Sequence, residues 1–170
     1  MGVLAEYLKT ERDQLQAEGK NQAEAIAEWQ GALSRLYEQL TEWLQAADGG
    51  LGVLSVKQLH QHDIQEPRLG GYSAPILTFN LGGRRGHVWP RARYVAATIH
   101  PAGREPRRAD GMVELRYDTT AEYYLFRWKG ESGDEWFIQS VTGWKQAKEY
   151  GTVEPLDRDR FEAAVLRILQ

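Results

Sequence analysis

Apolar residues between positions 26 and 47 recur at alternating intervals of three and four. This spacing is typical of a helix with one apolar seam, as in a coiled coil. Tyr37 and Leu44 flank the seam and widen it, which indicates a helix that packs on more than one neighbour. The seam ends at Ala47, just before Asp48-Gly49-Gly50, which predicts a helix stop. The predicted helical interface is Ile26, Trp29, Leu33, Leu36, Leu40 and Trp43.

A weaker helical pattern precedes this seam, with Leu4, Tyr7, Leu8 and Leu15 as its apolar positions. Asn21 and Glu24 have the spacing of a capping box, which marks a helix start. Extending the heptad pattern backwards would place Arg12 and Gly19 on the seam, so the sequence favours a break or bend at Gly19. One unbroken helix is the alternative, because a glycine inside a helix costs only about 1 kcal/mol relative to alanine.

After residue 50 the pattern changes to short alternating runs separated by turn residues, which indicates β-structure. Pro90 is expected to interrupt one ladder, and residues 100–111 are expected to form an exposed polar loop. Asp157 is the predicted cap of a last helix that buries Phe161, Val165, Leu166 and Leu169. The predicted strands are 53–60, 76–81, 87–89, 93–99, 113–117, 122–129 and 135–141.

Together these segments predict an α+β protein. Residues 1–50 form a helical arm or hairpin with its heptad seam at 26–47, and residues 51–170 form an antiparallel β-domain. Six or seven strands are expected, closed by the helix 157–169. The alternation of polar and apolar residues in 113–117 predicts a sheet that is open on one side. There is no βαβ alternation, which argues against a doubly wound sheet.

The composition narrows the possible chemistry. The chain has no cysteine, which excludes disulfides, thiolate catalysis and cysteine-ligated metal centres. No segment approaches the roughly 18 to 20 apolar residues that cross a bilayer, and the N-terminus lacks the pattern of a signal peptide. The sequence therefore predicts a cytoplasmic protein without a membrane partner, and no cofactor is expected.

Charge is segregated along the chain. Residues 51–110 carry nine bases and four acids, whereas residues 1–50 carry four bases and nine acids. Arginines dominate the basic segment and are the predicted anion-binding or partner-binding residues: Arg84, Arg85, Arg91, Arg93, Arg104, Arg107 and Arg108. Trp89 and Tyr94 lie among them, which suits RNA or single-stranded DNA. The pI of 5.8 and the lack of a known RNA-binding signature argue against it. Pairing with the acidic helical arm and plain surface exposure are the alternatives.

Catalytic and metal-binding signals are weak. His60 and His62 lie two residues apart on a predicted strand, as two metal ligands would, but no third ligand has matching spacing, so no metal site is expected. No serine elbow or phosphate-binding loop is present. Four acids stay open as acid–base candidates: Glu114, Asp118, Glu122 and Glu135. The predicted hairpin 122–141 and its exit hold seven large rings, which form core or an interface with a second chain: Tyr123, Tyr124, Phe126, Trp128, Trp136, Phe137 and Trp144.

The sequence thus favours a non-enzymatic interaction module. The helical arm would bind a helix of a twin subunit or of another protein, and the arginine-rich surface would face an acidic partner. A nucleic-acid-binding accessory protein is the alternative that uses the same arginines. An enzyme of unrecognised type is the third hypothesis.

Overall fold

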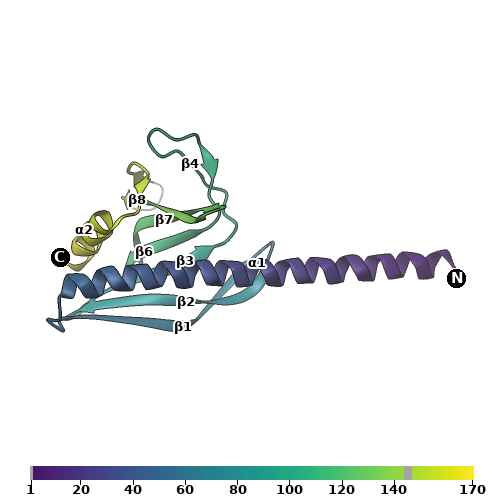
Figure 1. Cartoon of the computed structure of the whole chain (residues 1–170), viewed down its shortest axis with the longest axis horizontal. Helices are drawn as coiled ribbons and strands as arrows, with labels where there is room; N and C mark the ends of the chain where they lie inside the picture. The colour runs from purple at the N-terminus through teal and green to yellow at the C-terminus, as the bar shows by residue number, and fades with distance from the viewer. Residues whose placement is uncertain (1, 144–146) are drawn as a thin grey trace.

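The computed structural model describes residues 2–143 and 147–170, without the side chains of residues 60 and 61. It confirms the α+β class, with a long helix first, an antiparallel sheet and a short helix last (Figure 1). The helices are α1 (Val3–Asp48) and α2 (Arg158–Leu169). The strands are β1 (Leu54–Glu66), β2 (Gly70–Leu81), β3 (Arg84–Ala92), β4 (Thr98–Ile99), β5 (Arg107–Arg108), β6 (Met112–Tyr117), β7 (Thr120–Gly130), β8 (Gly133–Thr142), β9 (Glu149–Tyr150) and β10 (Glu154–Pro155).

Helix α1 is unbroken over 46 residues, so the expected break at Gly19 is wrong. Asn21 and Glu24 lie inside the helix and cap nothing. A single interior glycine costs about 1 kcal/mol, whereas a second helix start would require a new, unfavourable nucleus. The predicted stop is confirmed, since Gly49 adopts a left-handed conformation with φ 58° and its N–H donates to the Gln45 carbonyl.

The burial pattern of α1 differs from the predicted seam. The buried side chains follow the 3.6-residue period of a straight helix, so the stripe drifts onto Leu44, while Ala47 is exposed. These side chains pack on the chain's own sheet and on α2. The interface predicted for another helix therefore lies largely inside this chain's core, with Ile26 and Trp43 only partly buried. The buried residues of α1 are Trp29, Ala32, Leu33, Leu36, Tyr37, Leu40 and Leu44.

Within the described residues the main sheet has eight strands, more than the six or seven expected. Their order is β1-β2-β3-β6-β7-β8-β10, with β9 also paired to β8, while β4 and β5 form a separate ribbon. All these pairs are antiparallel. The additional strands are pieces of two residues, too short for an alternating pattern to show in the sequence.

The chain leaves the sheet after β3, where a strand over 93–99 was expected. Pro90 does not end β3; it pairs with Val113, and the register shifts between Pro90 and Ala92. The buried carboxylate of Glu66 then accepts the backbone N–H groups of Arg93 at 3.0 Å and Tyr94 at 2.9 Å. Because these donors bond to a side chain, this segment forms no ladder, and only Thr98–Ile99 is a strand.

The segment after β3 covers part of the sheet face opposite α1. Ile99 and Ala109 pack there on Phe126, Trp128 and Phe137, so that face is not fully open as expected. The loop expected to be exposed throughout contains β5 and contributes Ala109 to this second core. On the α1 side, Trp136 of the same hairpin stacks on Trp29 at 6.3 Å between ring centroids. The rings of β7 and β8 thus serve both cores, while Trp144 lies outside the described residues.

A buried ion network joins α1 to the sheet. Arg127 is 1% exposed and donates to Asp134 at 2.7 Å and to Glu28. Arg35 also donates to Asp134, at 2.7 Å. Burial alone would raise the pKa values of Glu28 and Asp134, but hydrogen bonds and charge from these arginines more than offset it, and both pKa values lie below their ordinary range. The network fixes where α1 crosses β7 and β8.

Helix α2 closes the domain as predicted. The Asp157 side chain accepts the Arg160 N–H at 2.8 Å, which confirms the cap. Phe161, Val165 and Leu169 are buried, but Leu166, expected among them, is 58% exposed. None of the helices in the described part of the chain combines the length and apolar content needed to cross a lipid bilayer.

Alanine should have opposite effects at Gly19, which lies inside α1, and at Gly111, which lies against Trp29 of α1. A Cβ at Gly19 meets no heavy atom within 4 Å, so Gly19→Ala should stabilise the arm by about 1 kcal/mol. Gly111 has φ 152° and a Cβ there would lie 2.4 Å from the Trp29 ring, so Gly111→Ala should destabilise the fold by about 3 kcal/mol. Amide exchange in the arm measures the effect of Gly19→Ala, and denaturant unfolding measures the effect of Gly111→Ala. Faster exchange in the arm of Gly19→Ala would contradict a continuous helix.

The ion network predicts a large cost for losing its buried cation. Arg127→Met keeps an apolar stem but leaves Glu28 and Asp134 without this guanidinium, and should lower the free energy of unfolding by about 3 kcal/mol. Arg12→Ala is the control, because Arg12 and its partner Asp13 are both exposed. It should change stability by less than about 0.5 kcal/mol. Equal effects of both substitutions in urea unfolding would refute this role of Arg127.

Candidate functional site: a projecting helical arm

The N-terminal part of α1 extends beyond the sheet (Figure 1). We call residues 3–21 the free arm, since all of them are exposed or half-exposed. The helix meets the domain at Gln22, whose Nε2 donates to the Arg68 carbonyl at 3.2 Å. At 1.5 Å per residue the free arm is about 28 Å long.

The free arm carries large apolar side chains with no cover. Leu4 is 68% exposed, Leu8 56% and Leu15 65%. At 3.6 residues per turn all three lie within about 40° of the buried Leu40 around the helix axis. The apolar side of α1 is therefore continuous, and the sheet covers it only in its C-terminal half. A large exposed apolar stripe of this kind marks an interaction surface.

Charged residues border this stripe unequally. Glu11 and Glu18 lie about 40° and 60° from Leu15 in one direction around the axis, and Arg12 lies about 60° away in the other. Tyr7, 59% exposed, lies on the acidic side. At the base of the arm is a hollow of about 380 Å³, lined by Glu18, Asn21, Gln22, Ala25, Arg68, Leu69 and Tyr94. Arg68 stacks on the Tyr94 ring there, at 4.2 Å from its centroid.

The sequence prediction missed the free arm as a site. Its apolar positions were visible, but the expected break at Gly19 separated them from the seam. With α1 unbroken, Leu4, Leu8 and Leu15 continue the buried stripe at the period of a straight helix. That continuation is the signal that identifies the arm.

The predicted arginine surface is only partly assembled, since Arg104 and Arg107 both lie over the Trp128 ring, at 5.1 Å and 5.4 Å from its centroid. Arg104 pairs with Glu135 at 2.8 Å, and Arg107 with Asp110 at 2.7 Å. Arg93 lies 3.6 Å from Glu28. Of these three ion pairs, this is the one formed with the acidic helical arm, which the sequence predicts as a partner of the arginines. The other four have partners on separate elements: Arg84 donates to the Leu169 carbonyl, Arg85 to Asn80 and Arg108 to the Val95 carbonyl, and Arg91 lies 3.8 Å from Glu114. These contacts favour pairing within the chain.

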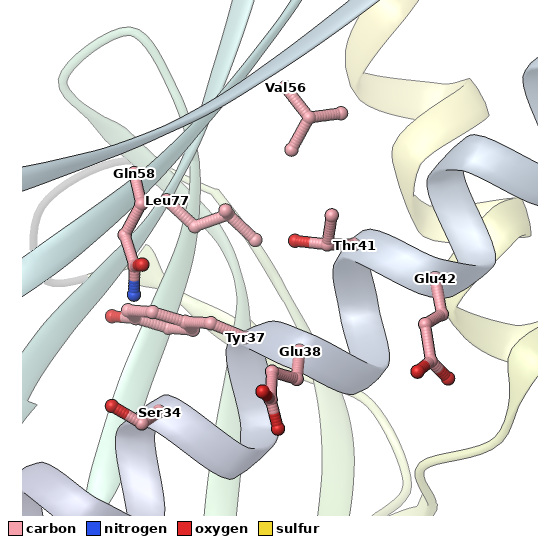
Figure 2. Close-up of a pocket in the computed structure, with 8 residues that line it drawn as sticks. All are labelled: Ser34, Tyr37, Glu38, Thr41, Glu42, Val56, Gln58 and Leu77. Carbon is pink, nitrogen blue, oxygen red and sulfur yellow. The ribbon is translucent and has the colours of Figure 1, made fainter.

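An open groove of about 500 Å³ lies between α1 and the first two strands. Figure 2 shows the Gln58 amide directed toward Tyr37, and the carboxylates of Glu38 and Glu42 pointing away from Val56.

Of the four acids considered for acid–base chemistry, Glu114 binds Arg116 and Glu135 binds Arg104. Both carboxylates are thus occupied by structural ion pairs.

His62 takes part in an aromatic cluster. The ring centroids of His62 and Trp89 lie 4.4 Å apart, and those of His87 and Trp89 lie 6.2 Å apart. The Arg116 guanidinium carbon lies 4.5 Å from the Trp89 ring centroid. The Thr78 hydroxyl lies 2.9 Å from His87 Nδ1. The side chain of His60 is outside the described residues, and among those described no group of three or more His, Cys, Asp or Glu could hold a metal ion.

This cluster predicts a pH-dependent stability. Burial and then the Arg116 charge lower the pKa of His62; burial and then Arg85 lower that of His87, each against a smaller opposing carboxylate effect. The folded state binds protons less readily than unfolded histidine, with its ordinary pKa of about 6.5, so stability should fall as pH drops from about 7.5 to 5.5. Urea unfolding of His62→Gln/His87→Gln should show a flatter profile there. The exposed His100→Gln is the control, and an unchanged profile in the double variant would contradict the assignment.

Comparison with known proteins found no match for this chain. No family model matches the chain, and no curated protein and no solved structure is significantly similar to it. Any function assigned to the chain therefore rests on its own geometry, of which the free arm is the most distinctive part.

Proposed function

We propose that this chain is a non-enzymatic protein-association module whose free arm binds an apolar helix. One observation carries the proposal. The apolar side of α1 is continuous, buried by the sheet from Trp29 to Leu44 and bare at Leu4, Leu8 and Leu15. Burying a leucine side chain contributes about 1.5 to 3 kcal/mol relative to exposure. A helix laid on this stripe would thus gain substantial binding energy.

The lack of packing along the arm supports the same proposal. Most helical stability in proteins comes from tertiary packing of an amphipathic face, and residues 3–21 are all exposed or half-exposed. A partner would bury the bare stripe and stabilise the arm at the same time. The β-domain then serves as the rigid base that fixes the arm's direction.

The arginine surface remains the basis of the nucleic-acid alternative, and its geometry supports that alternative less well. Phosphate recognition requires guanidinium groups that are free to form bidentate contacts. Arg104, Arg107 and Arg91 instead contact carboxylates of the same chain. We therefore place the function in the arm.

Replacing the bare leucines tests the proposal. Leu4→Ser/Leu8→Ser/Leu15→Ser should leave the melting temperature of the β-domain within about 2 °C, because these side chains make no contribution to the core. It should abolish association with the partner, measured by crosslinking in cells. Leu166→Ser, on the exposed side of α2, is the matched control and should associate normally. Undiminished association of the triple variant would refute the proposal.

A further inference from the structure

We infer that the helix recognised by the free arm belongs to a different protein and carries lysine or arginine along one edge of a leucine stripe. This inference rests on the proposed function. It concerns the chemistry of the partner, which the borders of the stripe and the position of the sheet restrict.

The exposed stripe on which a partner helix would lie is blocked at its C-terminal end. The turn that holds Arg68 and Leu69 meets α1 at Gln22, on the side where the sheet begins. Beyond it, Trp29 and Leu33 are fully covered, at 0% exposure, by the chain's own sheet and α2. A helix lying on the stripe must therefore end near this turn. The hollow between Ala25, Arg68 and Tyr94 offers space for that end.

A second copy of the chain in parallel orientation does not fit on this stripe. Its α1 would run beside this α1 in the same direction and would continue past Gln22. The space that its later turns would occupy is filled by the sheet packed on Trp29 and Leu33. Since α1 is unbroken through this point, the two helices would have to diverge before residue 29.

A second copy in antiparallel orientation meets a charge conflict. The two-fold rotation that relates two antiparallel helices places the same flank of each side by side. Glu11 and Glu18 would then face Glu11 and Glu18 of the other arm, with the Arg12 side chains together on the opposite edge. Like charges between adjacent helix positions destabilise the pair. The acidic edge is instead complementary to a basic edge on a different helix.

Two synthetic helical peptides of 18 residues provide the test. Both carry the same leucine stripe; one has lysines and the other glutamates along one edge. Anisotropy titration against the full chain should show the lysine peptide binding about tenfold tighter at low salt, because two opposite-charge contacts replace two like-charge ones. The difference should shrink as salt screens these exposed charges.

Matched charge reversals then locate the recognition. Glu11→Lys/Glu18→Lys should reverse the preference between the two peptides. Glu6→Lys/Asp13→Lys changes the net charge equally, but these residues lie about 160° to 180° from Leu15 around the axis, so the preference should persist. Loss of the preference in both variants would show a general charge effect and would overturn the inference.

The remaining outcomes separate the inference from the proposed function. Equal binding of both peptides, abolished by the triple serine variant, would overturn the basic partner and retain the association module. Sedimentation of the native chain as a dimer that the triple serine variant abolishes would identify a second copy and also overturn the inference. Binding of neither peptide, by a monomer that the serine substitutions leave unchanged, would overturn both.

Discussion

The fold depends on the burial of one side of α1 against the sheet. Trp29, Leu33 and Leu40 are completely covered, and they bring strands from both halves of the sheet and α2 into one core. Close packing makes the contact demanding, since Gly111 approaches the Trp29 ring so closely that a Cβ would overlap it. Without this helix the sheet would expose an apolar face to water, which association or unfolding would have to relieve.

Polar contacts determine where the helix lies on that face. Apolar burial has little directional preference, whereas a buried guanidinium between two carboxylates tolerates few positions. Arg127 holds Glu28 of α1 and Asp134 of β8 together. At the C-terminal end of α1, the Asp48 carboxylate accepts the N–H groups of Gly52 at 2.7 Å, Val53 at 3.0 Å and Leu54 at 2.9 Å. These contacts fix both ends of the packed segment, so the free arm leaves the domain in a defined direction.

The same helix thus has two roles along its length. Its packed half is part of the core, and its free half presents the same apolar side to solvent. Such a division suits a module that presents a rigid helix to a partner, because little additional ordering is needed on binding. The acidic edge formed by Glu11 and Glu18 adds selectivity through charge, and the turn at Arg68 and Leu69 limits how far a partner can extend.

Local patterns in the sequence were sufficient for the α+β class, the stop at Gly49, the β7–β8 hairpin and the cap at Asp157. Each depends on neighbours in the chain: a period, a turn or a side chain that bonds to a nearby N–H. The interactions that decided the rest join residues far apart. Glu66 diverts residues 93 and 94 from the sheet, and Arg127 bonds to a helix residue 99 positions away. The destination of the seam was undetermined for the same reason, since an apolar stripe specifies burial but not the surface that covers it. Only the packed sheet, which ends near Gln22, decided that the residues from Trp29 to Leu44 form core and that Leu4, Leu8 and Leu15 remain free.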